Sequence, residues 1–281
     1  MNTHIVSHRW VWTCVSSAGL LASATSYSHA STYQAEVLAD NPLIYYRLGE
    51  SGGSTATNLG THGASGNGTY TNFAAAAFGQ TGIPGGGGDT AVQFDGANDW
   101  ISSTFDVVST GDSTVTLEAW VKLTADVTTN GYAVSYLRDN QNNRYHAIGV
   151  NSSEQPILSQ DQAGGGGTAT GSSALVSGEW YHLVAVFDAS PSPDKLYVNG
   201  TLAASINGPN PDSATRRFYV GLLHNRSGGT GWFKGIIDEV AFYNYQLPES
   251  RILAHYNVGI PEPASLAGLG ISTTLLLRRR R

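Results

Sequence analysis

Residues 113–123 read STVTLEAWVKL, and the order of apolar and polar side chains in this stretch decides the fold class. Every second residue from Val115 to Leu123 is apolar, whereas the residues between them include Glu118 and Lys122. Successive side chains of a strand point to opposite faces of a sheet. The alternation therefore predicts a strand with one face against a core and the other face toward solvent.

Four further stretches have the pattern of strands. They are EWYHLVAVFD (179–188), KLYVNGTLAAS (195–205), FYVGLL (218–223) and GIIDEVAFY (235–243). The first is apolar on both faces, which is typical of a central strand between two layers. The pair Asn199-Gly200 favours a two-residue hairpin turn. One short helix is predicted after the last strand, because Pro248 suits a first helical turn and Ile252 and Tyr256 supply an apolar stripe.

Six segments carry a family resemblance, and together they span nearly all of residues 33–257. In chain order they are NPLIYYRLGESGG, AVQFDGANDWI, TLEAWVKL, GEWYHLVAVFD, KLYVNGTLAAS and GIIDEVAFYNYQLPESRILAHY. In kind and order they resemble the laminin G-like domains of the concanavalin A-like superfamily. The resemblance implies an all-β jelly-roll sandwich of two antiparallel sheets. It also implies binding of carbohydrate or protein at the loop rim or on the concave face.

The C-terminus has three zones: a Pro-Glu-Pro triplet, an uncharged run over residues 264–277 and four arginines. The run has 14 residues, so it forms only a short membrane helix, because a full span takes about 20. The arginines are expected to stay on the cytoplasmic side. The zones resemble the bacterial PEP-CTERM sorting signal, which implies cleavage by an exosortase near the triplet. The motif residues are Pro261, Glu262, Pro263, Arg278, Arg279, Arg280 and Arg281.

The N-terminus has the pattern of a secretory signal peptide. Arg9 precedes an apolar region, and Ser28-His29-Ala30 has the small residues of a cleavage site. We expect a signal peptide over 1–30, a laminin G-like domain over 31–258 and a sorting signal over 259–281. The protein is then exported from a Gram-negative-type bacterium, held briefly at the inner membrane, and released to the cell surface or extracellular matrix.

Charge excludes one class of partner. The whole chain has a formal charge of −6, and removing both ends takes away five of the 15 basic residues and one of the 21 acidic ones, which leaves −10. Nucleic acid binding needs clustered Lys and Arg to neutralise phosphates. We therefore expect no nucleic acid partner.

No catalytic residues are predicted, and the expectation is that the protein is not an enzyme. Glycosidases also occur in the superfamily, but they need two carboxylates that face one another across about 5–10 Å. Asp238 and Glu239 are adjacent, so a regular strand would point them to opposite faces, and Glu118 stands alone on its strand. We expect His182 to pack within its strand and His255 to lie on the helix surface.

Calcium is the one cofactor considered, because hard cations take oxygen ligands from loops rich in Asp, Asn and Gly. The resemblance implies a structural site at Glu50, Asn58 and Asp238 that ties the N-terminal segment to the last strand. Relatives more often have Asp where this chain has Asn58, so the set lacks one charge. Asp95 and Asp99 of FDGANDW form a second candidate metal cluster. The alternative for that pair is an Asx-turn.

Trp232, which follows a glycine-rich loop, and Tyr136 with the nearby Asp139 are the candidate ligand-binding residues. Sugars stack on exposed rings and bond to the polar groups beside them. The expected partner is an extracellular polysaccharide or surface glycan. Two alternatives stay open. One is a structural matrix or biofilm protein without a small ligand, and the other is a glycoside hydrolase of the same superfamily.

We predict that the extracellular protein lacks residues 1–30 and ends near Pro261 to Pro263, because both ends carry sorting chemistry and neither fits the sandwich pattern. Intact-mass spectrometry of the secreted form measures both ends. Recovery of an extracellular chain that still ends in Arg278 to Arg281 would overturn the sorting interpretation.

Overall fold

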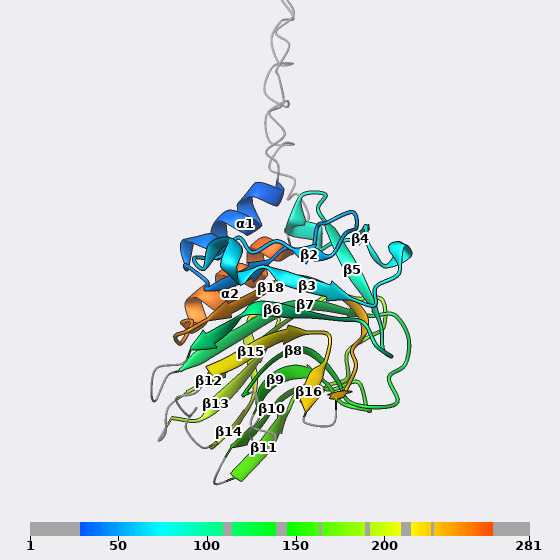
Figure 1. The fold of residues 1–281 in the computed structure, drawn as a ribbon. Coiled ribbons are helices and arrows are strands. Elements are labelled where there is room, and N and C mark those ends of the chain that lie inside the picture. The colour runs from blue at the N-terminus through cyan, green and yellow to red at the C-terminus, as the bar shows by residue number, and fades with distance from the viewer. Residues whose placement is uncertain are drawn as a thin grey trace, which may run out of the picture.

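The fold is a sandwich of two antiparallel eight-stranded sheets, A and B, with a separate two-stranded hairpin (Figure 1). The computed structural model describes residues 29–108, 114–138, 145–162, 165–188, 192–208, 215–225 and 228–260. This architecture confirms the predicted all-β, two-sheet fold with a short helix after the last strand. The signal peptide up to residue 28 and the sorting residues from Pro261 onward lie outside the described residues.

Sheet A contains the strand that the sequence predicts over residues 113–123. Its order is β14 (Thr201–Ile206), β13 (Asp194–Val198), β12 (Tyr181–Phe187), β7 (Val115–Leu123), β18 (Lys234–Tyr243), β5 (Thr90–Asp95) and β4 (Gln80–Thr81), and β1 (Ile44–Tyr46) also pairs with β18. The predicted hairpin at Asn199-Gly200 is confirmed, since both residues have positive φ (52° and 76°) and join β13 to β14. Such angles are typical of the turn that matches strand twist.

Sheet B supplies the opposite layer. Its order is β11 (Gly165–Thr170), β10 (Pro156–Gln162), β9 (Tyr145–Val150), β8 (Gly131–Arg138), β15 (Thr215–Val220), β6 (Trp100–Val108), β3 (Gly68–Thr71) and β2 (Thr55–Ala56). The hairpin consists of β16 (Leu223–Asn225) and β17 (Gly228–Thr230). Three short 3-10 helices, η1 (Gly63–Gly66), η2 (Ala75–Ala77) and η3 (Pro84–Gly86), lie in the connections.

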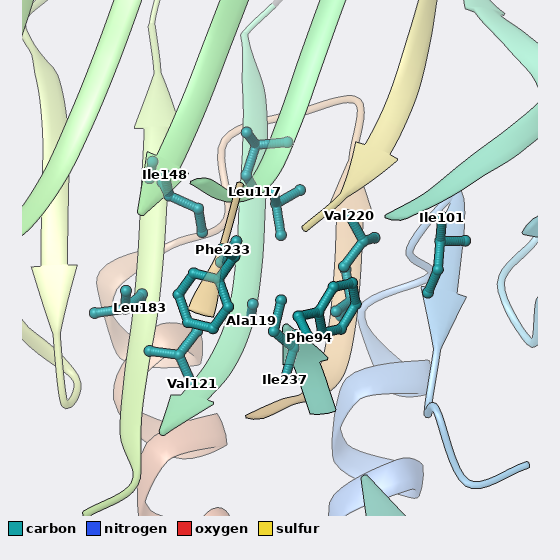
Figure 2. Close-up of a cluster of buried hydrophobic side chains, with 14 of the residues drawn as sticks. Phe94, Ile101, Leu117, Ala119, Val121, Ile148, Leu183, Val220, Phe233 and Ile237 are labelled. Atoms are coloured by element: carbon teal, nitrogen blue, oxygen red, sulfur yellow. The ribbon is translucent and has the colours of Figure 1, made fainter. Parts of the chain in front are cut away.

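The hydrophobic core lies between the facing sides of the two sheets (Figure 2). Leu117 and Val121 of β7 belong to it, and Ile148 and Val220 come from sheet B. Each of these four side chains is fully buried. Complete burial of a Leu, Ile or Val side chain is worth about 1.5–3 kcal/mol each, so this alternating set is the main source of cohesion between the sheets.

Two helices cover the outer side of sheet A (Figure 1). Helix α2 (Glu249–Gly259) is the predicted one, with Pro248 at its start and Ile252 fully buried. Helix α1 (His29–Ala39) was not predicted, and it begins two residues before the expected cleavage point after Ala30. Because both helices pack on this side, Trp120 of β7 is fully buried there. The prediction that β7 faces solvent on one side is therefore wrong.

None of the helices in the described part of the chain is long and apolar enough to cross a bilayer.

Candidate functional site

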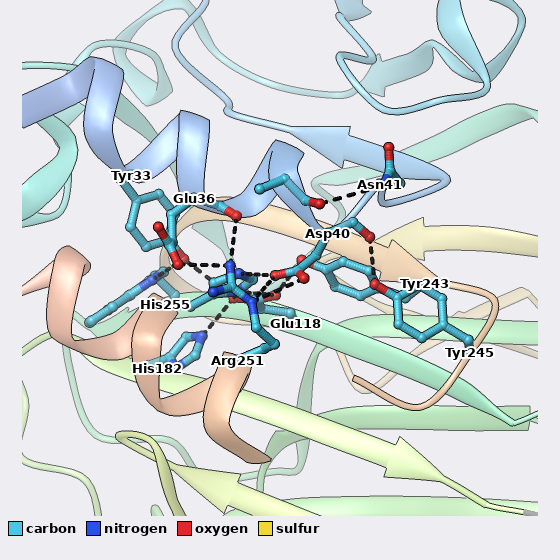
Figure 3. Close-up of polar contacts among 12 residues, drawn as sticks. Tyr33, Glu36, Asp40, Asn41, Glu118, His182, Tyr243, Tyr245, Arg251 and His255 are labelled. Carbon is cyan, nitrogen blue, oxygen red and sulfur yellow. Dashed lines mark hydrogen bonds and ion pairs between the residues drawn. The ribbon is translucent and has the colours of Figure 1, made fainter. Parts of the chain in front are cut away.

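Glu118 of β7 is fully buried and lies at the centre of a polar cluster between sheet A and the two helices (Figure 3). Its carboxylate accepts hydrogen bonds from Tyr243 Oη (2.8 Å), His182 Nε2 (2.8 Å) and His255 Nδ1 (2.9 Å). These partners come from β18, β12 and α2. The sequence predicts no partner for Glu118 on its own strand, whereas the fold surrounds its carboxylate with hydrogen-bond donors from other elements.

The two histidines that face Glu118 differ in charge. Burial lowers the pKa of His182, even though Glu118 acts in the opposite direction, so His182 is neutral and donates through Nε2. Burial would also lower the pKa of His255, but Glu118 and Asp40 together raise it to about 9. His255 is therefore a cation at pH 7. Burial alone would raise the pKa of Glu118, but the two histidines hold it well below its ordinary range.

The cluster continues outward to helix α1. His255 donates from Nε2 to Asp40 Oδ2 (2.9 Å), and Arg251 donates from Nε to the same oxygen (2.8 Å). Arg251 also pairs with Glu36 (2.7 Å). The expectation that His255 lies on the helix surface is wrong, because its ring is fully buried between two carboxylates. Glu118 is closed off from solvent, and the cluster joins α1 and α2 to the sheet.

A second group of acids lies where β18 carries a β-bulge. Glu239 has a positive φ of 50°, and the register of β18 against β7 shifts between Asp238 and Ala241. The bulge interrupts the strict alternation. The prediction that Asp238 and Glu239 point to opposite faces is therefore wrong: both carboxylates are buried, and both experience the charges of Arg47 and Asp89.

The residues predicted to bind calcium are engaged with different segments of the chain. Asn58 Oδ1 accepts from Tyr45 N (2.8 Å) and Gly60 N (2.9 Å), and its amide donates to Gly63 O (3.0 Å). Glu50 accepts from Thr57 N and Tyr70 Oη (2.8 Å each). Asp238 Oδ2 accepts from Ile83 N (2.9 Å), and its buried Oδ1 has no hydrogen-bond partner among the described residues. Across the described ranges, no three His, Cys, Asp or Glu side chains are grouped to hold a metal ion.

Asp95 and Asp99, the second candidate metal cluster, stabilise the turn between β5 and β6. Asp95 Oδ1 accepts from Ala97 N (2.7 Å) and Asn98 N (3.1 Å), which is the Asx-turn arrangement. Asp99 Oδ2 accepts from Asp95 N (3.0 Å). Both side chains also line a hollow of about 230 Å³. Gln93 and three alanines are among the other residues that line it.

The structure describes two of the three candidate ligand-binding residues, Tyr136 and Trp232. Tyr136 is fully buried and packs against Phe242, with ring centroids 5.0 Å apart, so the prediction that it contacts a ligand is wrong. Successive side chains of β8 point to opposite faces of sheet B, and the side chain of Tyr136 lies on the face toward the core. Asp139 lies outside the described residues. Trp232 is half-buried, so part of its surface remains in solvent.

The outer side of sheet B carries an aromatic cluster that was not predicted from the sequence. Tyr132, Tyr219 and Leu223 pack together there, and the half-buried rings of Trp100 and Tyr145 lie against them. The ring centroids of Trp100 and Tyr219 are 5.8 Å apart. The alternation Tyr145, His146, Ala147, Ile148 in β9 is the sequence signal that could have located this face. We call the surface formed by Tyr132, Tyr219, Leu223, Trp100 and Tyr145 the outer face of sheet B.

Hydroxyl groups accompany the rings on the outer face of sheet B. Tyr145 Oη lies 3.3 Å from Ser159 Oγ, which lies 3.2 Å from Thr168 Oγ1. Trp232 adjoins the other end of the face, because Tyr132 N donates to Gly231 O (2.9 Å). Half-exposed rings beside hydroxyls can stack on an apolar ring face and bond to polar substituents. This combination suits a ligand that is apolar on its face and polar at its edge.

Comparison with protein families places the chain among known sequences. The model of the concanavalin A-like lectin/glucanases superfamily matches residues 94–253. A search of curated proteins gave no match. The match confirms the laminin G-like, concanavalin A-like resemblance, and the strands before residue 94 complete the same two sheets.

Solved structures with the same fold include a domain of an arabinanase, the binding domain of a mosquitocidal protein and a sialidase. Domain 4 of AbnA, a GH43 extracellular arabinanase from Geobacillus stearothermophilus, is 20% identical, with a TM-score of 0.55 and coverage of 77% of this chain and 98% of that one. The binding domain of Paraclostridial Mosquitocidal Protein 1 is 15% identical (TM-score 0.57, coverage 78% and 52%). A Trypanosoma rangeli sialidase is 13% identical (TM-score 0.55, coverage 82% and 38%). At these identities the likeness is one of fold.

We predict that the melting temperature falls as the pH rises from 7 to 10 and that His255→Gln flattens this fall. The folded-state pKa of His255 is about 9 against an ordinary value of 6.5. Its contribution is therefore fully present below pH 6.5 and is lost as the pH rises through 9. The difference corresponds to about 3 kcal/mol, or several degrees. Melts of both proteins across this range measure it, and parallel curves would contradict the assignment.

Proposed function

The chain belongs to the concanavalin A-like lectin/glucanases superfamily, and we propose that it is an exported carbohydrate-binding module that holds its ligand on the outer face of sheet B. One observation carries the proposal. The outer side of sheet A is covered by α1 and α2, whereas the outer face of sheet B keeps half-exposed rings beside a row of hydroxyls. Pyranose rings have apolar faces and hydroxyl edges, which matches this surface.

Trp100, Tyr145 and Trp232 are the aromatic residues proposed to contact the sugar. Each is half-buried, so its ring is held in place by the protein while one part stays in solvent. A ring that is already ordered loses little conformational entropy when a ligand binds. Thr168 of β11 is exposed and would then bond to a sugar hydroxyl, while the buried Ser159 of β10 holds the Thr168 Oγ1 in place.

We also propose that the module binds sugar without hydrolysing it. Hydrolysis needs two carboxylates that can reach a glycosidic bond. Glu118 is closed in by histidines and helices, and Glu239 is buried against Tyr45 and Arg47. Neither is placed to contact a polysaccharide, and both are engaged in bonds that the fold uses.

One solved neighbour supports this proposal. Domain 4 of the Geobacillus arabinanase was solved in complex with arabinotriose, so the same fold holds an oligosaccharide in that protein. The chain covers only 38% of the Trypanosoma sialidase, so that enzyme's activity is not transferred here.

Export and sorting are also proposed, from the sequence of the two ends. The signal peptide pattern over residues 1–30 and the Pro-Glu-Pro, apolar and arginine zones support secretion, processing by an exosortase-type enzyme and release among extracellular polysaccharide. A module that binds such polysaccharide would then contribute to adhesion or to the matrix.

We predict that Trp100→Ala and Trp232→Ala each weaken binding of the full chain to polysaccharide about tenfold or more. Removing an aromatic anchor from a binding surface costs about 2 kcal/mol, and 1.4 kcal/mol is a factor of ten. A glycan array identifies a bound sugar, and isothermal titration then measures the affinity of each variant, with thermal melts recorded in parallel.

Trp180→Ala is the matched control for both variants. Trp180 is also half-buried, but it packs on the sheet A side, where Lys122 Nζ lies 4.7 Å from its ring centroid. Loss of binding in the control as well would point to general destabilisation. If no glycan binds the wild-type protein, the structural matrix alternative replaces the binding module. Release of sugar from β-glucan, agar or carrageenan would instead establish a hydrolase.

A further inference from the structure

Arg47 lies between the N-terminal part of the chain and the last strand of sheet A. It directly follows β1, which pairs with β18. Its Nη2 lies 2.5 Å from Asp89 Oδ2 and 3.1 Å from Glu239 Oε1, and its Nε donates to the same Glu239 oxygen (3.2 Å). Nη1 lies 3.4 Å from Gln34 Oε1 on helix α1. One guanidinium thus contacts α1, the loop after η3 and β18.

The acidic side chains around Arg47 are stabilised in their charged form by its positive charge. Asp238 and Glu239 are both fully buried, and Asp89 is close enough to raise the pKa of each. Burial is the largest cause of the rise, and Arg47 acts against it at both carboxyls. Buried like charges destabilise a fold unless a counter-charge lies among them.

The family resemblance assigns the tie between these same segments to calcium, but the residues present do not fit that ion. All four polar atoms of the Glu50 and Asn58 side chains already bond within the protein. Of the three predicted ligands, only Asp238 has an oxygen without a hydrogen-bond partner in the described part of the chain. A calcium site takes six to eight oxygen ligands, and among the described residues no three His, Cys, Asp or Glu side chains are grouped to supply them.

We infer that the guanidinium of Arg47 replaces calcium as the cation that ties the N-terminal segment to the last strand, so that closure of this sandwich does not depend on calcium. Arginine suits this position, because its planar group presents several donors at once and stays charged when half-buried. The inference concerns the fold and does not depend on whether sugar binds to the outer face of sheet B.

Thermal melts of the full chain test the inference in two ways. With calcium in excess and with chelator, the wild-type midpoint should be the same. Arg47→Met should lower the midpoint by several degrees, because it leaves Asp89 and Glu239 without their counter-charge. Lys234→Met is the control, since Lys234 is an exposed cation at the start of the same strand, β18.

A double-mutant cycle isolates the pair. Glu239→Gln should cost less in the Arg47→Met background than in the wild type, because there it no longer removes a pairing with the guanidinium. If Arg47→Met does not fold, Arg47→Lys, which keeps the charge but not the planar fork, replaces it in the same cycle with urea midpoints. A calcium-induced rise in the wild-type midpoint that Asp238→Asn abolishes would overturn the inference. So would an additive cycle, or a cost of Arg47→Met equal to that of Lys234→Met.

Discussion

Burial of the Glu118 carboxylate in the middle of sheet A is the constraint on which the remaining arrangement depends. A buried charge without partners costs several kcal/mol, so the surrounding chain must supply donors and a cation. Tyr243 and His182 come from neighbouring strands, but the cation is His255, which lies on α2. His255 in turn bonds to Asp40 beside α1. Satisfying one carboxylate therefore requires both helices to dock, and once docked they exclude ligands from this side of the sandwich.

A second charged junction ties the start of the fold to its end by the same logic. The bulge at Glu239 turns two consecutive acids into the protein, and Arg47 from the N-terminal part of the chain pairs with Glu239. The two junctions share strand β18, which carries Tyr243 at one point and Glu239 at another. Each junction contains residues from before β5 and residues from β18 or α2. Both ends of the domain are therefore needed to close the sandwich.

The strands and the hairpin at Asn199-Gly200 were predictable, because alternation and turn residues are local properties of the sequence. The second buried face of β7 was not, because helix α1 has only 11 residues and needs the sheet to be stable. His255 and Glu118 are 137 positions apart, and no local pattern joins them. The alternation rule misplaced Asp238 and Glu239, since a bulge is a backbone event that side-chain pattern does not report. Tyr136 was misassigned because an aromatic residue near a loop looks the same from sequence whether it faces the core or solvent.

The placement of the helices also decides which surface is free when the ends of the chain are held. The described fold begins at α1 and finishes just after α2, and both helices lie on the side of sheet A (Figure 1). The proposed sorting tail follows α2 directly, at Pro261. A protein held through this tail would be attached on the sheet A side. The rings of Trp100 and Tyr145 belong to the opposite layer, so the attachment leaves the proposed sugar-binding face open to polysaccharide.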